Sequence, residues 1–130
     1  MISVRISCPV NPSESEDLVL DAVMKIFPDA AMERTSMGFE GTAPGIERFS
    51  MLVRRQKILD AARAVLIKGL KDDSTSFRLN KQVATVGKVS FATKGAVLGA
   101  IDVRIDDDDD IELYIDAMLP RTIEGQEVRS

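Results

Sequence analysis

The segment from Phe49 to Leu70 places the strongest constraint on the fold of this chain. Apolar residues recur in it at steps of three and four positions, and neither proline nor glycine interrupts the pattern before Gly69. This spacing predicts one long amphipathic helix whose apolar face must be buried against a second layer. The residues of that face are Met51, Leu52, Ile58, Leu59, Ala62, Leu66 and Leu70.

Apolar and polar residues alternate in several segments outside this helix, as they do in strands with one buried face. The alternation is clear in residues 2–8, 76–80, 89–93 and 101–105, and it is weaker in residues 31–36. The chain is therefore expected to contain a sheet with one apolar face and one polar face.

Two shorter helices are also expected. Ser13 and Glu16 have the spacing of a capping box, and a helix should follow to about Phe27. Another helix is predicted over residues 108–119, where aspartates at its start complement the helix dipole. The segment 38–45 is rich in glycine and proline, which predicts an exposed loop.

These elements predict an α+β fold of two layers, a mainly antiparallel sheet with helices packed on one of its faces. Residues 1–130 are expected to form a single domain, with about 122–130 as a flexible tail. The polar face of the sheet is then open to solvent or to a partner. Its residues would be Ser3, Arg5, Ser7, Arg78, Asn80, Lys88, Ser90, Asp102 and Arg104, of which four are basic and one is acidic.

Charge is distributed unevenly along the chain, although the net charge is only −4. Residues 47–94 hold eleven Lys/Arg and four Asp/Glu, a net of +7. Residues 1–46 hold three and seven, and residues 95–130 hold three and ten, so the flanks are −4 and −7. The local field decides phosphate binding more than the total charge does, so the basic centre favours an anionic partner.

The polar donors in and beside the basic centre are of the kinds that contact nucleic-acid phosphates. All five phenylalanines are expected in the core or in loops, so the polar face lacks the aromatic platform that readers of single-stranded RNA use. Structured RNA fits this face better. The candidate RNA-binding residues are Arg5, Arg78, Asn80, Lys81, Gln82, Lys88 and Arg104.

Arg55 is a separate candidate for anion binding. Its neighbours at three and four positions are Met51, Leu52, Ile58 and Leu59, all of them apolar. A partly buried guanidinium at this place needs a carboxylate or a phosphate. The simpler interpretation is that the stem of Arg55 lies along the core while its charged end is exposed.

The absence of histidine excludes most common catalytic schemes. Acid–base chemistry near neutral pH, Ser–His or Cys–His nucleophiles and the usual zinc sites all depend on this side chain. No catalytic residue, cofactor or metal is therefore assigned. The single Cys8 fits a reducing cytoplasm, and no apolar run is long enough to span a membrane.

Several motifs are similar to those of a family of small archaeal proteins that carries an RNA-binding label. The two central motifs are RQKILDAAR at 55–63 and LNKQVATVGKVSF at 79–91. The segments PVNP at 9–12, IFPD at 26–29 and LGAIDV at 98–103 match the same family. The resemblance implies a fold similar to that of the ribosomal protein that binds five-S RNA. It implies no catalytic residues, because the family has none assigned.

Three functions are consistent with these observations. The first is a non-enzymatic cytoplasmic protein that binds structured RNA or a ribonucleoprotein. The second is a homodimeric protein-interaction module that uses the polar sheet face or an edge strand. The third is an enzyme acting on a phosphorylated small molecule, with Mg²⁺ bound by the run Asp106–Asp110 or by Glu112. An enzyme should have a deep pocket where carboxylates meet Lys81 or Lys88.

Overall fold

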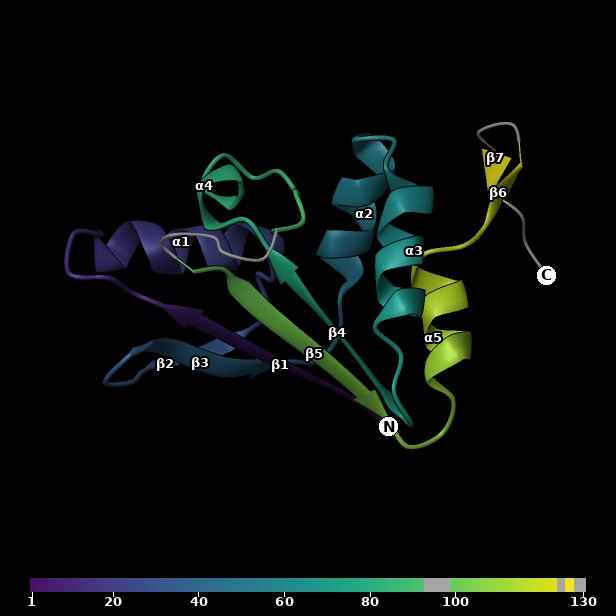
Figure 1. The fold of residues 1–130 in the computed structure, drawn as a ribbon, viewed down its shortest axis with the longest axis horizontal. Coiled ribbons are helices and arrows are strands. Elements are labelled where there is room, and N and C mark those ends of the chain that lie inside the picture. Colours follow the sequence, from purple (N-terminus) through teal and green to yellow (C-terminus); the bar gives the residue numbers. More distant parts are fainter. Residues whose placement is uncertain (93–98, 124–125, 128–130) are drawn as a thin grey trace.

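The computed structural model describes residues 1–92, 99–123 and 126–127. Five antiparallel strands form one sheet in the order β2-β3-β1-β5-β4, and helices cover one of its faces (Figure 1). The predicted α+β class with an antiparallel sheet is confirmed. The elements are β1 Ile2–Pro9, α1 Glu16–Ile26, β2 Ala31–Arg34, β3 Gly38–Ala43, α2 Glu47–Arg55, α3 Leu59–Lys68, β4 Ser74–Leu79, α4 Lys81–Ala84, β5 Ile101–Asp107, α5 Ile111–Met118, β6 Thr122–Ile123 and β7 Gln126–Glu127.

The core lies between the sheet and the helices. Phe49 on α2 is fully buried, and its ring lies 5.1 Å from that of Phe77 on β4, measured between centroids. Phe27 and Phe91 each lie 6.3 Å from Phe49. Aromatic pairs at these distances add to the stabilisation from burial. This cluster fixes the helix layer against the β4 side of the sheet.

The predicted long helix is two helices. α2 ends at Arg55 and α3 begins at Leu59, with Lys57 between them at a φ of 58°. The sequence prediction was wrong here because the apolar spacing continues across the break, and neither proline nor glycine marks it. The break lets both helices bury apolar residues, including Val53 on α2 and Leu66 on α3.

The expected loop over residues 38–45 is also a correction, because Gly38–Ala43 form β3 inside the sheet. Its two glycines allow close approach of neighbouring strands. A Cβ on Gly38 would lie 2.1 Å from the carbonyl oxygen of Cys8, and a Cβ on Gly41 would lie 2.1 Å from that of Ala31. Glycine in a strand has this use, so these residues do not indicate a loop here.

Smaller differences concern the ends of elements. Ser15, rather than Ser13, caps α1, and its hydroxyl accepts a hydrogen bond from the backbone N–H of Leu18 at 3.4 Å. Residues 89–92 do not form the predicted strand and contribute one bridge, between Phe91 and Leu79; residue 93 lies outside the described part. In the expected tail, 122–123 pair with 126–127, and 124–125 and 128–130 lie outside the described residues.

Candidate functional site

The uncovered face of the sheet, called the open face below, presents rows of side chains from all five strands. In one row, Arg5 on β1 lies opposite Thr42 on β3 and opposite Arg104 on β5, and Arg104 lies opposite Ser76 on β4. Neighbouring strands are about 4.8 Å apart, so Arg5 and Arg104 start from adjacent points on the backbone. The sheet therefore places two guanidinium groups side by side on an exposed surface.

A second row lies two residues further along the strands. It runs from Glu33 on β2 through Glu40, Ser7 and Asp102 to Arg78 on β4. Both rows line one wide, open cavity of about 960 Å³. The residues that line it are Arg5, Ile6, Ser7, Ala31, Glu33, Glu40, Gly41, Thr42, Ser76, Phe77, Arg78, Asp102, Val103 and Arg104.

The three arginines of the open face differ in their ion pairs. Arg78 donates to Asp102 at 2.8 Å, and Arg104 donates to Asp106 at 3.2 Å. Such exposed pairs contribute little to stability and open easily for a competing anion. Within the described part of the chain, no ion pair involves Arg5. Arg5 is thus the arginine of this face that is already available to an anion.

The open face carries more negative charge than the sequence predicted. The carboxylates of Glu33 and Glu40 belong to it, together with those of Asp102 and Asp106. Sequence analysis missed both glutamates, Glu40 because its segment was assigned to a loop. The signal was present, because Glu40 alternates with Phe39 and Gly41 as a strand residue does. The arginines therefore lie on β1, β5 and β4 with two aspartates beside them on β5, and the two glutamates lie on β2 and β3.

Lys81 does not lie on the open face, which corrects its assignment as an RNA contact. Its side chain is 4% exposed, and its ammonium donates to the Pro9 carbonyl and to the Glu14 carboxylate, each at 2.8 Å. The same Glu14 oxygen accepts from the backbone and side-chain nitrogens of Asn11 at 3.0 and 2.8 Å. A buried ammonium must be paired in this way. We call Pro9, Asn11, Glu14 and Lys81 the Lys81 cluster.

Burial alone would raise the pKa of Glu14, but the hydrogen bonds from Lys81 and Asn11 outweigh it. The pKa of Glu14 is consequently lowered below 4.5. On the neighbouring strand residue Cys8, burial raises the pKa of the thiol from 9.0 to about 12. The Glu14 carboxyl is therefore ionised and the Cys8 thiol neutral at physiological pH.

Asn80 and Gln82 also lie away from the open face. Asn80 caps α4, and its side-chain oxygen accepts from the backbone N–H of Val83 at 3.0 Å. Gln82 is exposed and lines a small cavity of about 270 Å³ between α1 and α4. A carboxylate and a lysine do meet there, but they are Glu14 and Lys81, already paired with each other. This differs from the deep pocket expected of an enzyme.

Lys88 and Arg55, predicted as separate contacts, lie on segments that Gln56 joins. Gln56, next to Arg55, donates to the Val89 carbonyl at 2.8 Å and accepts from the Val89 backbone N–H at 2.7 Å. Lys88 precedes Val89, and both Lys88 and Arg55 are exposed. The exposure of Arg55 agrees with the simpler interpretation of that residue. Lys57 lies beside them and is exposed too, so this junction is a second basic surface.

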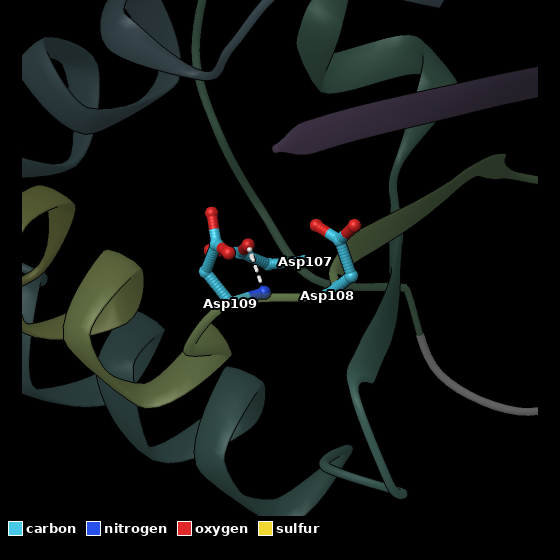
Figure 2. A group of neighbouring side chains, drawn as sticks. All are labelled: Asp107, Asp108 and Asp109. Carbon is cyan, nitrogen blue, oxygen red and sulfur yellow. Dashed lines mark hydrogen bonds between the residues drawn. The ribbon is translucent and has the colours of Figure 1, made fainter.

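The aspartate run has mainly structural contacts. Asp107 is buried and accepts from the backbone N–H of Asp109 at 2.9 Å, as Figure 2 shows. Oxygen atoms of Asp107, Asp108 and Asp109 lie within 4.8 Å of one another. The Met1 ammonium contacts all three, and hydrogen bonds to Asp108 and Asp109 raise its pKa to about 11. Asp110 caps α5, which begins at Ile111 and not at residue 108 as predicted.

Asp107 shapes the turn before α5, and its two exposed neighbours interact with the terminal ammonium. Among the described helices, none has the length and apolar character that crossing a membrane requires.

A family model described as "RNA binding" matches residues 3–106. A "UPF0200/UPF0201 protein" of Archaeoglobus fulgidus is 37% identical over 130 residues, which cover 98% of this chain but only 40% of that protein. A UPF0201 protein of Methanocaldococcus jannaschii is 37% identical over 95% of this chain and 76% of its own length. The crystal structure of a UPF0201 protein from Methanococcus jannaschii has a TM-score of 0.88 at 36% identity, over 99% of this chain and all of that one.

Proposed function

Because the chain belongs to the UPF0201 proteins and to the family whose model is described as RNA binding, we propose that it binds structured RNA, free or in a ribonucleoprotein, through the open face. The observation that carries the proposal is the pair formed by Arg5 and Arg104, directly opposite each other on a concave exposed surface. The role is that of a binding protein rather than of an enzyme.

Phosphate is the ligand chemistry that fits this pair. Two guanidinium groups on adjacent strands repel each other, and an anion between them removes the repulsion. Arg78 extends the cationic side of the face on β4, where its bond to Asp102 is exposed and replaceable. Three arginines on three neighbouring strands thus follow a line along which an RNA backbone can lie.

The form of the RNA follows from what the open face lacks. The one aromatic residue among the residues that line the cavity, Phe77, is 4% exposed, so its ring is part of the core. A single strand stacked base by base on aromatic rings therefore has no platform on this surface. Backbone contacts to a folded RNA suit it better. The carboxylates on β2 and β3 repel phosphate and so direct the backbone toward β1, β5 and β4.

Action in the cytoplasm is part of this proposal, since the one cysteine is a buried free thiol, which fits a reducing compartment. Association of two copies through the open face is the competing use of the same surface. Sedimentation of the protein with and without RNA separates the two, because a dimer that buries the face must dissociate before RNA binds.

Fluorescence anisotropy with folded and single-stranded RNAs, at several salt concentrations, tests the proposal. Arg5→Ala and Arg104→Ala should each weaken binding to all RNAs alike. Each should also reduce the slope of log affinity against log salt by roughly 0.7–0.9, as expected for one lost phosphate contact. Lys68→Ala, an exposed cation at the end of α3, is the matched control and should change neither quantity.

The second basic surface, which carries Arg55, Lys57 and Lys88, is the alternative place for RNA to bind. If the triple variant Arg55→Ala, Lys57→Ala, Lys88→Ala loses binding while Arg5→Ala does not, the RNA contacts the helix layer and the proposal for the open face is wrong. Absence of binding by the unmodified protein at low salt would remove RNA as the ligand altogether.

A further inference from the structure

The open face places like charges opposite each other twice. Arg5 lies opposite Arg104, and Glu33 lies opposite Glu40. Like charges directly across a strand pair are destabilising, and exchanging one residue of each pair would give two attractive pairs instead. Among the residues that the structure describes, neither glutamate takes part in an ion pair. The glutamate pair therefore costs stability that a ligand can recover, whereas Asp106 offsets part of the repulsion in the arginine pair.

Both pairs line the same cavity. The glutamate pair spans β2 and β3, and the arginine pair spans β1 and β5, so their centres are two strand spacings apart across the sheet. The pairs also belong to neighbouring rows, two residues apart along the strands, which brings the full separation to about 12 Å. This is the order of the distance from a phosphate to the far edge of its base. One ligand unit can thus reach both charged pairs at once.

The two charged pairs bind opposite kinds of chemical group, so a ligand that contacts both must carry an anion and hydrogen-bond donors. An arginine pair binds an anion such as phosphate, whereas an exposed carboxylate accepts hydrogen bonds and repels acceptors. Among RNA bases, guanine alone presents two adjacent donors, N1–H and the N2 amino group, on its Watson–Crick edge. Adenine and cytosine place a ring acceptor next to their amino group, and uracil flanks its N3–H with two carbonyls.

We propose that the cavity selects an unpaired guanine in the bound RNA, with Glu33 and Glu40 accepting from its Watson–Crick edge while Arg5 and Arg104 contact phosphate. This inference rests on the proposed function of the open face and adds the specificity of the site. The guanine must be unpaired, because pairing would occupy the edge that the carboxylates need. Loops and bulges of folded RNA present such bases.

Competition among RNA hairpins tests this. The hairpins share one duplex and differ in a single bulged nucleotide: guanosine, inosine, adenosine, cytidine or uridine. The unmodified protein should prefer the guanosine bulge by about fivefold or more over adenosine, cytidine and uridine. Inosine, which lacks the N2 amino group, should fall between them.

The double variant Glu33→Gln, Glu40→Gln keeps side-chain size and removes the charge. It should lose the preference for guanosine, while binding of the other hairpins stays equal or becomes tighter. Its melting temperature should be no lower than that of the unmodified protein, because a repulsive pair has gone. Glu112→Gln, an exposed carboxylate on α5 in the helix layer, is the matched control and should keep the preference.

Three results would overturn the inference. Equal binding of all hairpins by the unmodified protein, or a guanosine preference that survives in the double variant, shows that the carboxylates do not read the base. A uniform gain of affinity in the double variant shows that they only repel RNA. In each of these cases Arg5→Ala still weakens binding, so the proposed function stands; if no RNA binds at low salt, both proposals fail together.

Discussion

The Lys81 cluster and the open face use charged residues in opposite ways. Lys81 is buried, and its ammonium has a carbonyl and a carboxylate as partners. Arg5 is exposed, faces another arginine and has no ion pair within the described residues. Both residues were predicted to contact RNA. The difference shows that a cation is free for a ligand only where the fold leaves it unpaired.

The energetics of the two regions follow from burial. Removing one partner from a buried pair leaves an uncompensated charge in a medium that solvates it poorly, which is costly. Removing an exposed charge costs little stability, because water solvates that charge well and its interactions at the surface are weak. Substitutions in the Lys81 cluster should therefore act on stability, and substitutions on the open face should act on binding.

The largest effect is expected for Lys81→Met, which keeps the length of the side chain but removes its charge. The variant should lose up to about 3–5 kcal/mol of unfolding free energy, because the half-buried Glu14 carboxylate loses its counter-charge. Urea denaturation measures this loss. Lys88→Met, an exposed residue, is the control and should lie within about 0.5 kcal/mol of the unmodified protein.

A double variant sharpens the same measurement. Lys81→Met with Glu14→Gln removes both charges, so its loss should be smaller than the sum of the two single losses. If the losses of unfolding free energy are additive, Lys81 and Glu14 do not stabilise each other. The Lys81 cluster would then not differ from the open face in the way described above.

The next effect is alkaline destabilisation through Cys8, which lies on the buried side of the strand that carries Arg5. Burial raises the pKa of this thiol from 9.0 to about 12. The contribution of the neutral Cys8 thiol to the unfolding free energy is thus complete below pH 9.0, and it is lost between pH 9.0 and about 12. The loss should be about 1.4 kcal/mol per pH unit within that window.

Other groups titrate in the same range, so the thiol must be isolated by difference. The unfolding free energy of Cys8→Ala, measured from pH 8 to pH 11, should fall less steeply than that of the unmodified protein. Equal slopes would mean that the thiol is not protected by burial.

A smaller loss is expected on acidification through Glu14. Its pKa is lowered below 4.5 in the folded protein, so its contribution is present above pH 4.5 and is lost as the pH falls through the folded value. The loss should be smaller than in Lys81→Met, because a protonated carboxyl still hydrogen bonds. Thermal melting from pH 6 to pH 2.5 measures it, and Glu14→Gln should show a weaker dependence on pH.

The smallest effects on stability are expected on the open face. Arg5→Ala should change the unfolding free energy by no more than about 0.5 kcal/mol. Glu33→Lys, which places opposite charges across β2 and β3, should stabilise the protein by roughly 0.2–1 kcal/mol. A large loss in either variant, seen in urea denaturation, would mean that the open face is part of the structural core and not a surface reserved for a ligand.

The sequence predicted the elements that have clear periodicity. Alternation located β1 and β5, and the step of three and four found the buried face of α3. On α2 the same step selected Met51 and Leu52, which are half-buried, whereas Phe49 and Val53 are buried. It could not locate the break at Lys57, because a non-glycine residue takes a positive φ there. It also misassigned β3, since the glycines needed for close strand approach have the same composition as a loop.

The candidate site was predicted in part for the same reason. Arg5, Arg78 and Arg104 lie on strands whose alternation is visible, and they line one cavity. Glu40 could not be placed without β3, and the burial of Lys81 depends on Glu14, which is distant in sequence. Contacts between distant segments, unlike periodicity, leave no local trace in the sequence.

The side chain of Gln56 joins the junction of α2 and α3 to the segment after α4. We therefore expect the two to open together in local unfolding. The backbone amide hydrogen of Val89 is bonded to the Gln56 side chain rather than to a strand or helix. Its exchange with solvent deuterium should therefore follow the opening of the junction and not the fraying of α4, which has only four residues. Lys88, one residue earlier, is held by α4 instead, because its backbone N–H donates to the Val83 carbonyl at 3.3 Å. The place of Lys88 therefore depends on α4, and that of Val89 on the junction.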